Sequence, residues 1–175
     1  MYPLIRLFSV ANKAKKAESV AVGDCVETPV RCMPWDIDVY MELNNGRVLT
    51  LYDIGRTELA TRVGLIDVLR QNRWGLVVAG STVRYRKRIR MWDHITIKSQ
   101  VAGVDERWFY VRQSMSVDGV PCNSALLRTG VTSRGRTLPA ETVCEALGVE
   151  SKTILLDGWE KAWADLDNDR DWPPL

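Results

Sequence analysis

The sequence is poor in the residues that build metal centres and disulfide frameworks. It has one histidine and four cysteines, at positions 25, 32, 122 and 144, and none of them form a Cys-x-x-Cys pair. Cysteine/histidine zinc sites, paired-histidine motifs and most histidine-based relays therefore lack their side chains. We expect no metal and no other cofactor. We expect reduced, mostly buried cysteines, as in a cytoplasmic protein.

Long apolar runs and a large excess of one charge are also missing. The apolar stretch at residues 1–11 is about half of the roughly 20 residues that a membrane span needs. The lysines that follow it stand in the wrong order for a secretory signal. With 24 Lys and Arg against 22 Asp and Glu, the net charge is +2, so no general nucleic-acid-binding surface is predicted. Residues 1–20 are predicted to form a docking arm or short amphipathic helix, with peripheral membrane attachment as the alternative.

What is present fits one globular domain. The chain has 175 residues, of which 46% are hydrophobic and 26% charged, which is enough apolar material for one core. We expect the main domain over residues 21–138. Residues 139–175 read as a C-terminal helical extension, with helical patterns at 141–149 and 157–167 and a polar tail that ends in proline.

One long helix and a series of strands are predicted. Residues 46–63 carry an apolar face at helical spacing, formed by Val48, Leu51, Tyr52, Gly55, Leu59 and Val63. Glycine in the middle of that face indicates close approach of another backbone. Strands are predicted at 24–35, 75–92, 93–104, 107–117 and 121–133, with a hairpin turn at Asp118-Gly119. A helix followed by sequential strands predicts an α+β fold with the helix across an antiparallel sheet.

Chemistry is suggested by the acidic residues before the long helix. Asp36 and Asp38 lie just before Asn44-Asn45, which can cap the helix. The first turn of a helix has unpaired N–H groups and a partial positive charge, so it can polarise a carbonyl oxygen. A carboxylate beside it could attack the carbonyl or activate a water. These parts suffice to hydrolyse an activated ester. The alternative is that both aspartates only cap turns and the helix.

The segment WDIDVYMELNNGRVLTLYDIGRTEL, residues 35–59, resembles the signature of the hotdog-fold thioesterases. The 4-hydroxybenzoyl-CoA thioesterase-like families and the plant acyl-carrier-protein thioesterases share it. Tyr85 with its basic flank and Trp92-Asp93 extend the resemblance, which covers about residues 22–135. It implies a long central helix wrapped by a five- or six-stranded antiparallel sheet. It also implies a homodimer or homotetramer with active sites between protomers.

The resemblance assigns roles to individual residues. Asp38 falls on the catalytic aspartate, as nucleophile or general base. The amide of Asn45 or a neighbour is implied to hold the thioester oxygen, and Asn44 completes the pair that opens the helix. Glu42 stands at the usual histidine position, where it could serve as a second catalytic base or merely line the loop. Tyr40 stands where the plant enzymes carry an asparagine.

The implied function is hydrolysis of an acyl thioester, carried by coenzyme A or by an acyl-carrier protein. Because the usual histidine is replaced, a non-catalytic acyl-CoA or acyl-carrier binding protein on the same fold is the alternative.

Arginines alternate along the predicted strand 75–92. On a regular strand Arg84, Arg86, Arg88 and Arg90 would share one face over roughly 20 Å. Arginine binds phosphates bidentately, so this face could hold the phosphates of coenzyme A, as the family resemblance also implies. A solvated face paired with acids and a single-stranded nucleic-acid groove are the other interpretations.

Three further patterns are interpreted structurally. His94 is expected to be a turn or surface residue, because no nucleophile and orienting group accompany it. Arg56 and Glu58 on the long helix, with Asp53, resemble the family's acidic and arginine positions, and an intrahelical charge pair is the default interpretation. Trp159 and Trp163, four residues apart, predict a C-terminal helix that docks by its apolar face.

Overall fold

The computed structural model describes residues 3–171 and 173. Residues 1 and 2 of the predicted arm and residues 172, 174 and 175 of the predicted tail lie outside the described residues. The helices are α1 (Leu4–Ala14), α2 (Asn45–Arg62), α3 (Leu65–Asn72), α4 (Ala140–Leu147) and α5 (Gly158–Asn168), with short 3₁₀ turns η1 (Pro34–Asp36) and η2 (Ser151–Ile154). The strands are β1 (Val26–Arg31), β2 (Gly75–Tyr85), β3 (His94–Val104), β4 (Phe109–Val117), β5 (Val120–Ser133) and β6 (Arg136–Thr137).

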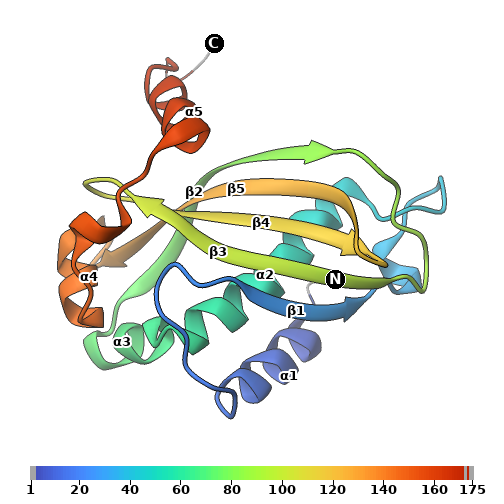
Figure 1. The fold of residues 1–175 in the computed structure, drawn as a ribbon, viewed down its shortest axis with the longest axis horizontal. Coiled ribbons are helices and arrows are strands. Elements are labelled where there is room, and N and C mark those ends of the chain that lie inside the picture. The colour runs from blue at the N-terminus through green and yellow to red at the C-terminus, as the bar shows by residue number, and fades with distance from the viewer. Residues whose placement is uncertain (1–2, 172, 174–175) are drawn as a thin grey trace.

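Within the described residues, six strands form one antiparallel sheet. Their order is β1-β3-β4-β5-β2, and β6 extends β5. The sheet curves over α2, with α1 below it and α5 on the opposite side of the sheet (Figure 1). This arrangement confirms the predicted α+β hotdog fold and its central helix. Its core lies between α2 and the inner face of the sheet, where Leu51, Ile54 and Ile97 are fully buried.

Asn44 determines where helix α2 begins, and Gly55 allows the helix to pack closely on the sheet. The side-chain oxygen of Asn44 accepts the Gly46 N–H at 2.9 Å, so this residue is the N-cap that the sequence predicts. A Cβ on Gly55 would lie 2.6 Å from Ser99 Oγ and 2.8 Å from Ile97 Cγ2, both on β3. The helix and the sheet do touch at this glycine, as predicted, but the nearest atoms belong to side chains of the sheet and not to another backbone.

The predicted N-terminal arm is a helix that packs beside α2. Leu7 and Val10 of α1 contact the main core, and Ala14 is buried. The Arg6 Nη1 atom lies 2.7 Å from the carboxylate of Asp36 in η1. Helix α1 is therefore joined both to α2 and to the segment that precedes it.

Strand β2 ends at Tyr85, well before the predicted end at residue 92. The N–H groups of Arg86 and Lys87 both donate to the carbonyl of Cys122, at 2.8 and 2.9 Å, so the chain leaves the regular ladder there. Arg90 forms an isolated bridge with Glu42. The prediction that Arg84, Arg86, Arg88 and Arg90 share one strand face is therefore wrong. The nucleic-acid interpretation, which depended on that face, loses its basis.

The two C-terminal helices cover different parts of the sheet: α4 lies at one end of it, and α5 lies on its outer face (Figure 1). On α5, Trp163 packs edge-on against Tyr110 with ring centroids 6.4 Å apart. Trp159 is 55% exposed, so only one of the two tryptophans docks the helix.

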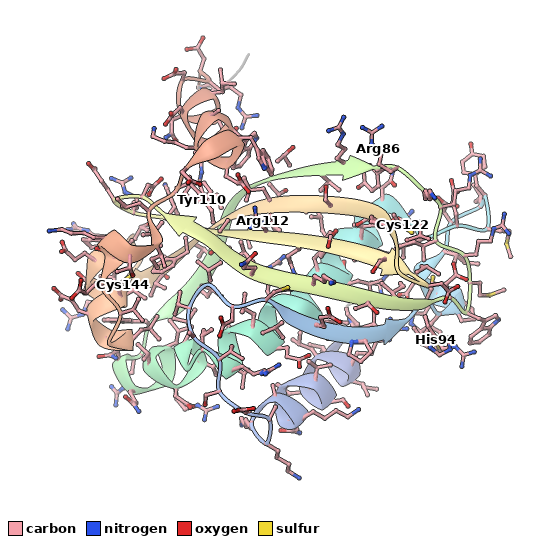
Figure 2. All side chains as sticks on the ribbon, in the orientation of Figure 1. Arg86, His94, Tyr110, Arg112, Cys122 and Cys144 are labelled. Carbon is pink, nitrogen blue, oxygen red and sulfur yellow. The ribbon has the colours of Figure 1, made fainter. Side chains whose placement is uncertain are left out.

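His94 is exposed at the start of β3, and Figure 2 shows it at the edge of the molecule. Both observations agree with a surface role for this histidine.

The cysteines follow the prediction with one exception. All four are free; those at 32, 122 and 144 are buried, and Cys25 is exposed. Burial, followed by the charges of Asp36 and Asp93, raises the pKa of the Cys32 thiol to about 11. This thiol therefore stays protonated at neutral pH.

Candidate functional site

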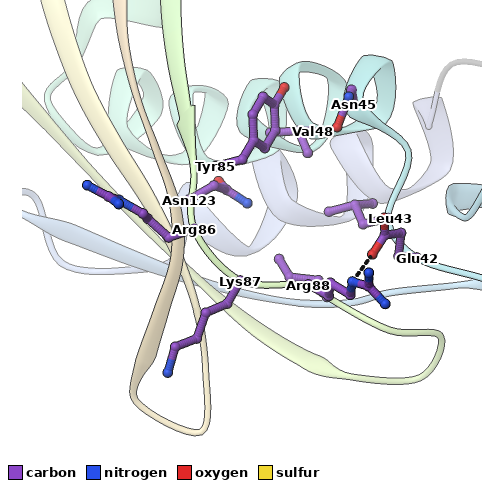
Figure 3. A pocket seen from close by; sticks show the side chains of 10 residues that line it. Glu42, Leu43, Asn45, Val48, Tyr85, Arg86, Lys87, Arg88 and Asn123 are labelled. Atoms are coloured by element: carbon purple, nitrogen blue, oxygen red, sulfur yellow. Dashed lines mark ion pairs between the residues drawn. The ribbon is translucent and has the colours of Figure 1, made fainter.

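A cavity of about 310 Å³ lies at the amino end of α2 (Figure 3). The turn before α2, the first turns of α2, the end of β2 with the loop after it, and β5 form its walls. Its lining residues are Glu42, Leu43, Asn45, Val48, Tyr85, Arg86, Lys87, Arg88, Ile89 and Asn123. The helix end that the sequence predicts as a carbonyl-binding element thus borders a cavity.

The first turn of α2 leaves a donor at this cavity. The Gly46 N–H is used by the Asn44 side chain, and the N–H groups of Arg47 and Val48 donate to the Asn44 carbonyl. The Asn45 N–H has no acceptor among the residues that the structure describes. Because the helix dipole adds positive potential here, this amide can bind a carbonyl oxygen or an oxyanion.

Asp38 lies in the tight turn between η1 and α2. Its N–H donates to the Glu42 carbonyl at 2.9 Å, and its Oδ1 accepts the Tyr40 N–H at 2.8 Å. Asp38 is partly buried and is not among the residues that line the cavity. Tyr40, at the tip of the turn, is 79% exposed. In this single chain, therefore, neither Asp38 nor Tyr40 contributes to the cavity wall.

Glu42 is the carboxylate that does line the cavity. Its Oε2 lies 3.0 Å from Arg88 Nε, with the glutamate side chain 29% and the arginine side chain 77% exposed. Figure 3 shows this ion pair and shows Arg86 and Lys87 pointing away from Glu42. The structure thus brings together the predicted residues Glu42, Asn45 and Arg88, with Arg86 at the cavity margin.

Asp36, the other predicted carboxylate, is fully buried and already neutralised. Its Oδ1 accepts from Arg47 Nη2 at 2.7 Å, and its Oδ2 accepts from Arg6 Nη1 at 2.7 Å and from the Met33 N–H at 3.0 Å. Burial alone would raise the pKa of Asp36, but the hydrogen bonds from Arg47, Arg6 and Met33 outweigh it and lower that pKa. Asp36 is therefore a structural anion that joins α1 and α2 to the turn carrying Asp38.

Arg84 is separated from the cavity. It lies on the outer face of the sheet, where it lines a second cavity of about 430 Å³ with Arg112 and Trp159. Tyr85, the next residue on β2, lines the first cavity. The predicted substrate-binding set of Arg84, Arg86 and Arg88 is therefore split between the two faces.

Asn123 is a cavity residue that sequence reasoning missed. It is buried on β5, and its Oδ1 accepts a hydrogen bond from the Tyr52 hydroxyl of α2 at 2.5 Å. Its amide nitrogen lies 3.7 Å from Met115 Sδ, a weak acceptor. A polar residue at an inward-facing strand position was the available signal. The Tyr52 bond sets how the amide sits in the cavity wall.

An intrahelical charge pair of the predicted kind is present on α2, whereas Glu58 lies 4.0 Å from Arg62. Arg56 is ion-paired with Asp53 and donates to Gln113 Oε1 at 2.8 Å. Gln113 Nε2 in turn donates to the Tyr52 carbonyl at 3.0 Å and to Ser99 Oγ at 2.7 Å. This buried network fixes α2 on the sheet.

Among residues 3–171 and 173, no group of three or more His, Cys, Asp and Glu side chains is placed to hold a metal ion. Over the same residues, no helix is long and apolar enough to cross a membrane.

Comparison with known proteins gives a relative of matching sequence. The chain is 35% identical over 81 residues to protein THEM6 of Xenopus laevis, a match that covers 46% of this chain and 39% of that protein. The match thus spans well under two thirds of that relative's length.

Solved structures share the fold at low identity. A probable thioesterase from Escherichia coli, YbaW, has a TM-score of 0.64 at 20% identity over 69% of this chain and 95% of that one. The gentisyl-coenzyme A thioesterase BH1999 has a TM-score of 0.62 at 13% identity, over 69% and 99% of the two chains. The family profile described as the thioesterase-like superfamily matches residues 32–148, which include the whole α2 cavity. The chain therefore belongs to the thioesterase-like superfamily.

Proposed function

We propose that this protein hydrolyses acyl thioesters, with acyl-CoA as the preferred carrier. The observation that carries the proposal is the Asn45 N–H, a helix-end donor with no acceptor in the part of the chain that the structure describes, at a cavity that also holds the Glu42 carboxylate. Membership of the thioesterase-like superfamily supports the same reaction.

The amide of Asn45 would hold the thioester carbonyl oxygen. Hydrolysis places negative charge on that oxygen as the carbonyl carbon becomes tetrahedral. A fixed N–H at a helix amino end stabilises this charge without reorganising. Such a donor is worth about 10²–10³ in rate where it has been removed from other enzymes.

A carboxylate of the turn between residues 38 and 42 would supply the base or nucleophile. The family resemblance implies Asp38 as the catalytic carboxylate, and Glu42 lines the cavity. We propose Asp38 as the reacting group. It does not line the cavity of a single chain, so association with a second protomer or binding of the substrate would have to bring it to the thioester. Glu42, paired with Arg88, would help to set the charge of the cavity.

The basic loop after β2 would bind the carrier. Arg86, Lys87 and Arg88 follow one another at the cavity margin. The phosphates of coenzyme A are the anionic groups that such a loop recognises. An acyl-carrier protein, which would present one phosphate and an acidic surface, is the other carrier that this loop fits.

We propose a homodimer formed through β2. This strand pairs with β5 on one side, and its other edge has no partner among the described residues. Leu76, Val77 and Val78 on this strand are 46%, 39% and 51% exposed. An open apolar edge strand is a template for pairing with another chain. Light scattering should give about twice the 19.8 kDa chain mass, and Val78→Lys should shift it to the monomer. A wild-type monomer at micromolar concentration would reject the dimer.

Thiol release from a panel of short, medium, long and aromatic acyl-CoAs tests the reaction. Asp38→Asn should lower turnover by about 10²-fold or more, the usual loss when a base or nucleophile is removed. Glu42→Gln should have a smaller effect, mainly on KM. Glu145→Gln, an exposed acid on α4 at the other end of the molecule, is the matched control.

The outcomes separate the possible roles. Equal turnover by wild type and Asp38→Asn would reject Asp38, and a 10²-fold loss in Glu42→Gln alone would transfer the role to Glu42. Tight acyl-CoA binding by wild type without any turnover would favour the non-catalytic binding protein. The cytoplasmic location stays a prediction; the four free cysteines agree with a reducing compartment.

A further inference from the structure

Helix α1 has a second apolar face that points away from the protein. Leu7, Val10 and Ala14 face α2 and the core. Leu4, Ile5 and Phe8 are 53%, 87% and 64% exposed. Large apolar side chains gathered on one exposed helix face indicate an interaction surface.

The three exposed residues lie on one side of the helix. Successive residues of an α-helix are about 100° apart, so positions 4, 5 and 8 fall within an arc of about 100°. Ile5 and Phe8 are also neighbours at helical spacing. Figure 1 shows α1 on the periphery of the fold, with α2 on its inner side.

A tryptophan from the next segment adjoins this helix. Arg6 stacks on the Trp35 ring, with Cζ 5.5 Å from the ring centroid, and Trp35 remains 64% exposed. The ion pair between Arg6 and Asp36 holds this contact in place. Around the helix, Arg6 lies about 100° from Ile5 and about 160° from Phe8, so this contact flanks the exposed apolar face and is not part of it.

The charge of this part of the chain has one sign. Residues 3–17 contain Arg6, Lys13, Lys15 and Lys16 and no aspartate or glutamate. The nearby Asp36 carboxylate is already paired with two arginines, and the first free acid along the chain is Glu18. Since the whole chain carries only +2, the positive charge of this segment is concentrated at Lys13, Lys15 and Lys16, at and just after the carboxyl end of α1.

We propose that the exposed face of α1, formed by Leu4, Ile5 and Phe8, binds the surface of an anionic lipid bilayer. The helix would lie in the plane of the interface, with Leu4, Ile5 and Phe8 among the acyl chains. The lysines at its carboxyl end would contact the headgroups. Amphipathic helices with basic flanks bind anionic membranes in this way.

The charge argues against a second copy of the chain as the occupant. A symmetric contact through α1 would place two identical basic helices together, and like charges would repel. An anionic lipid surface relieves that repulsion. This binding is independent of thioester hydrolysis, because Ile5 and Phe8 lie outside the α2 cavity.

Co-sedimentation of the full chain with vesicles tests the proposal. Wild type should bind phosphatidylcholine vesicles that contain about 30% phosphatidylserine, bind pure phosphatidylcholine at least about tenfold more weakly, and lose binding in high salt. Ile5→Glu with Phe8→Glu should weaken binding to the anionic vesicles by about tenfold or more, because two large apolar side chains no longer leave water. Leu166→Glu, at a leucine 72% exposed on α5, should bind as wild type.

The double variant should keep the circular dichroism and the thioester turnover of wild type, because both side chains are exposed. The proposal is overturned if wild type fails to sediment with anionic vesicles, or if Leu166→Glu loses binding equally. It is also overturned if binding is insensitive to salt and to lipid charge. Conversion of a dimer to a monomer by the double variant, without vesicle binding by wild type, would assign the face to a second copy.

Discussion

Replacing Asp36 by asparagine should cost a large part of the stability of this protein. The carboxylate is fully buried and accepts hydrogen bonds from Arg47, Arg6 and the Met33 N–H. Asparagine keeps one acceptor oxygen, turns an amide donor toward an arginine and leaves two cations without their counter-charge. Removing one partner of a buried ion pair costs about 3–5 kcal/mol. Since the free energy of unfolding of a domain is about 5–15 kcal/mol, this loss should be readily measurable.

Urea unfolding followed by tryptophan fluorescence measures this effect. With a slope of about 2 kcal/mol per molar urea, Asp36→Asn should lower the midpoint by about 2 M. Asp165→Asn is the control, because the Lys161–Asp165 pair is 57% and 55% exposed at i,i+4 spacing. Such pairs contribute about 0.3–0.5 kcal/mol. A loss for Asp36→Asn that matches this control would refute the role assigned to the buried carboxylate.

The stability difference between wild type and Asp36→Asn should depend on pH in a defined direction. Because the folded-state pKa of Asp36 is lowered, its contribution is complete above about pH 4, the ordinary value for an unfolded aspartate. It is lost as pH falls through the lower folded value. The stability difference between wild type and Asp36→Asn should therefore be constant from pH 5 to 7 and shrink below about pH 4. A difference that grows in acid would contradict this account.

Three more perturbations follow from the packing. Gly55→Ala should destabilise by about 1–3 kcal/mol in urea, because its Cβ would meet Ser99 Oγ at 2.6 Å; stabilisation, as helix propensity alone predicts, would contradict the close approach. Tyr52→Phe should cost about 1–3 kcal/mol by leaving Asn123 Oδ1 without its donor, and a neutral result would contradict that bond. In native protein at pH 8, an aromatic disulfide reagent should titrate Cys25 quickly and the buried thiols only after unfolding. Fast reaction of all four thiols would show that the core opens. The buried set is Cys32, Cys122 and Cys144.

Features encoded by short-range pattern were predictable. The apolar spacing of residues 46–63 and the asparagine before it were enough to place α2 and its cap. The glycine at 55 marked the contact with the sheet because only glycine leaves room there. The antiparallel sheet followed from successive strand-like segments and the Asp118-Gly119 turn.

Features that depend on distant partners were not predictable. The alternating arginines suggested a strand to residue 92, but both N–H groups after Tyr85 donate to one carbonyl on β5, which no local pattern records. Asp36 and Asp38 looked alike in sequence. One is buried because Arg6, thirty positions away, reaches it, and the other remains in an open turn. Asn123 was missed because its partner, Tyr52, is 71 positions away.

The bond between α1 and η1 affects where a shortened protein can begin. The family profile begins at residue 32, and a truncation at that point would remove Arg6 while keeping the buried acid that it neutralises. The fragment would hold a carboxylate in its interior with one cation where the full chain supplies two. The smallest autonomous folding unit should therefore start upstream of Arg6, however well the profile alone marks the family.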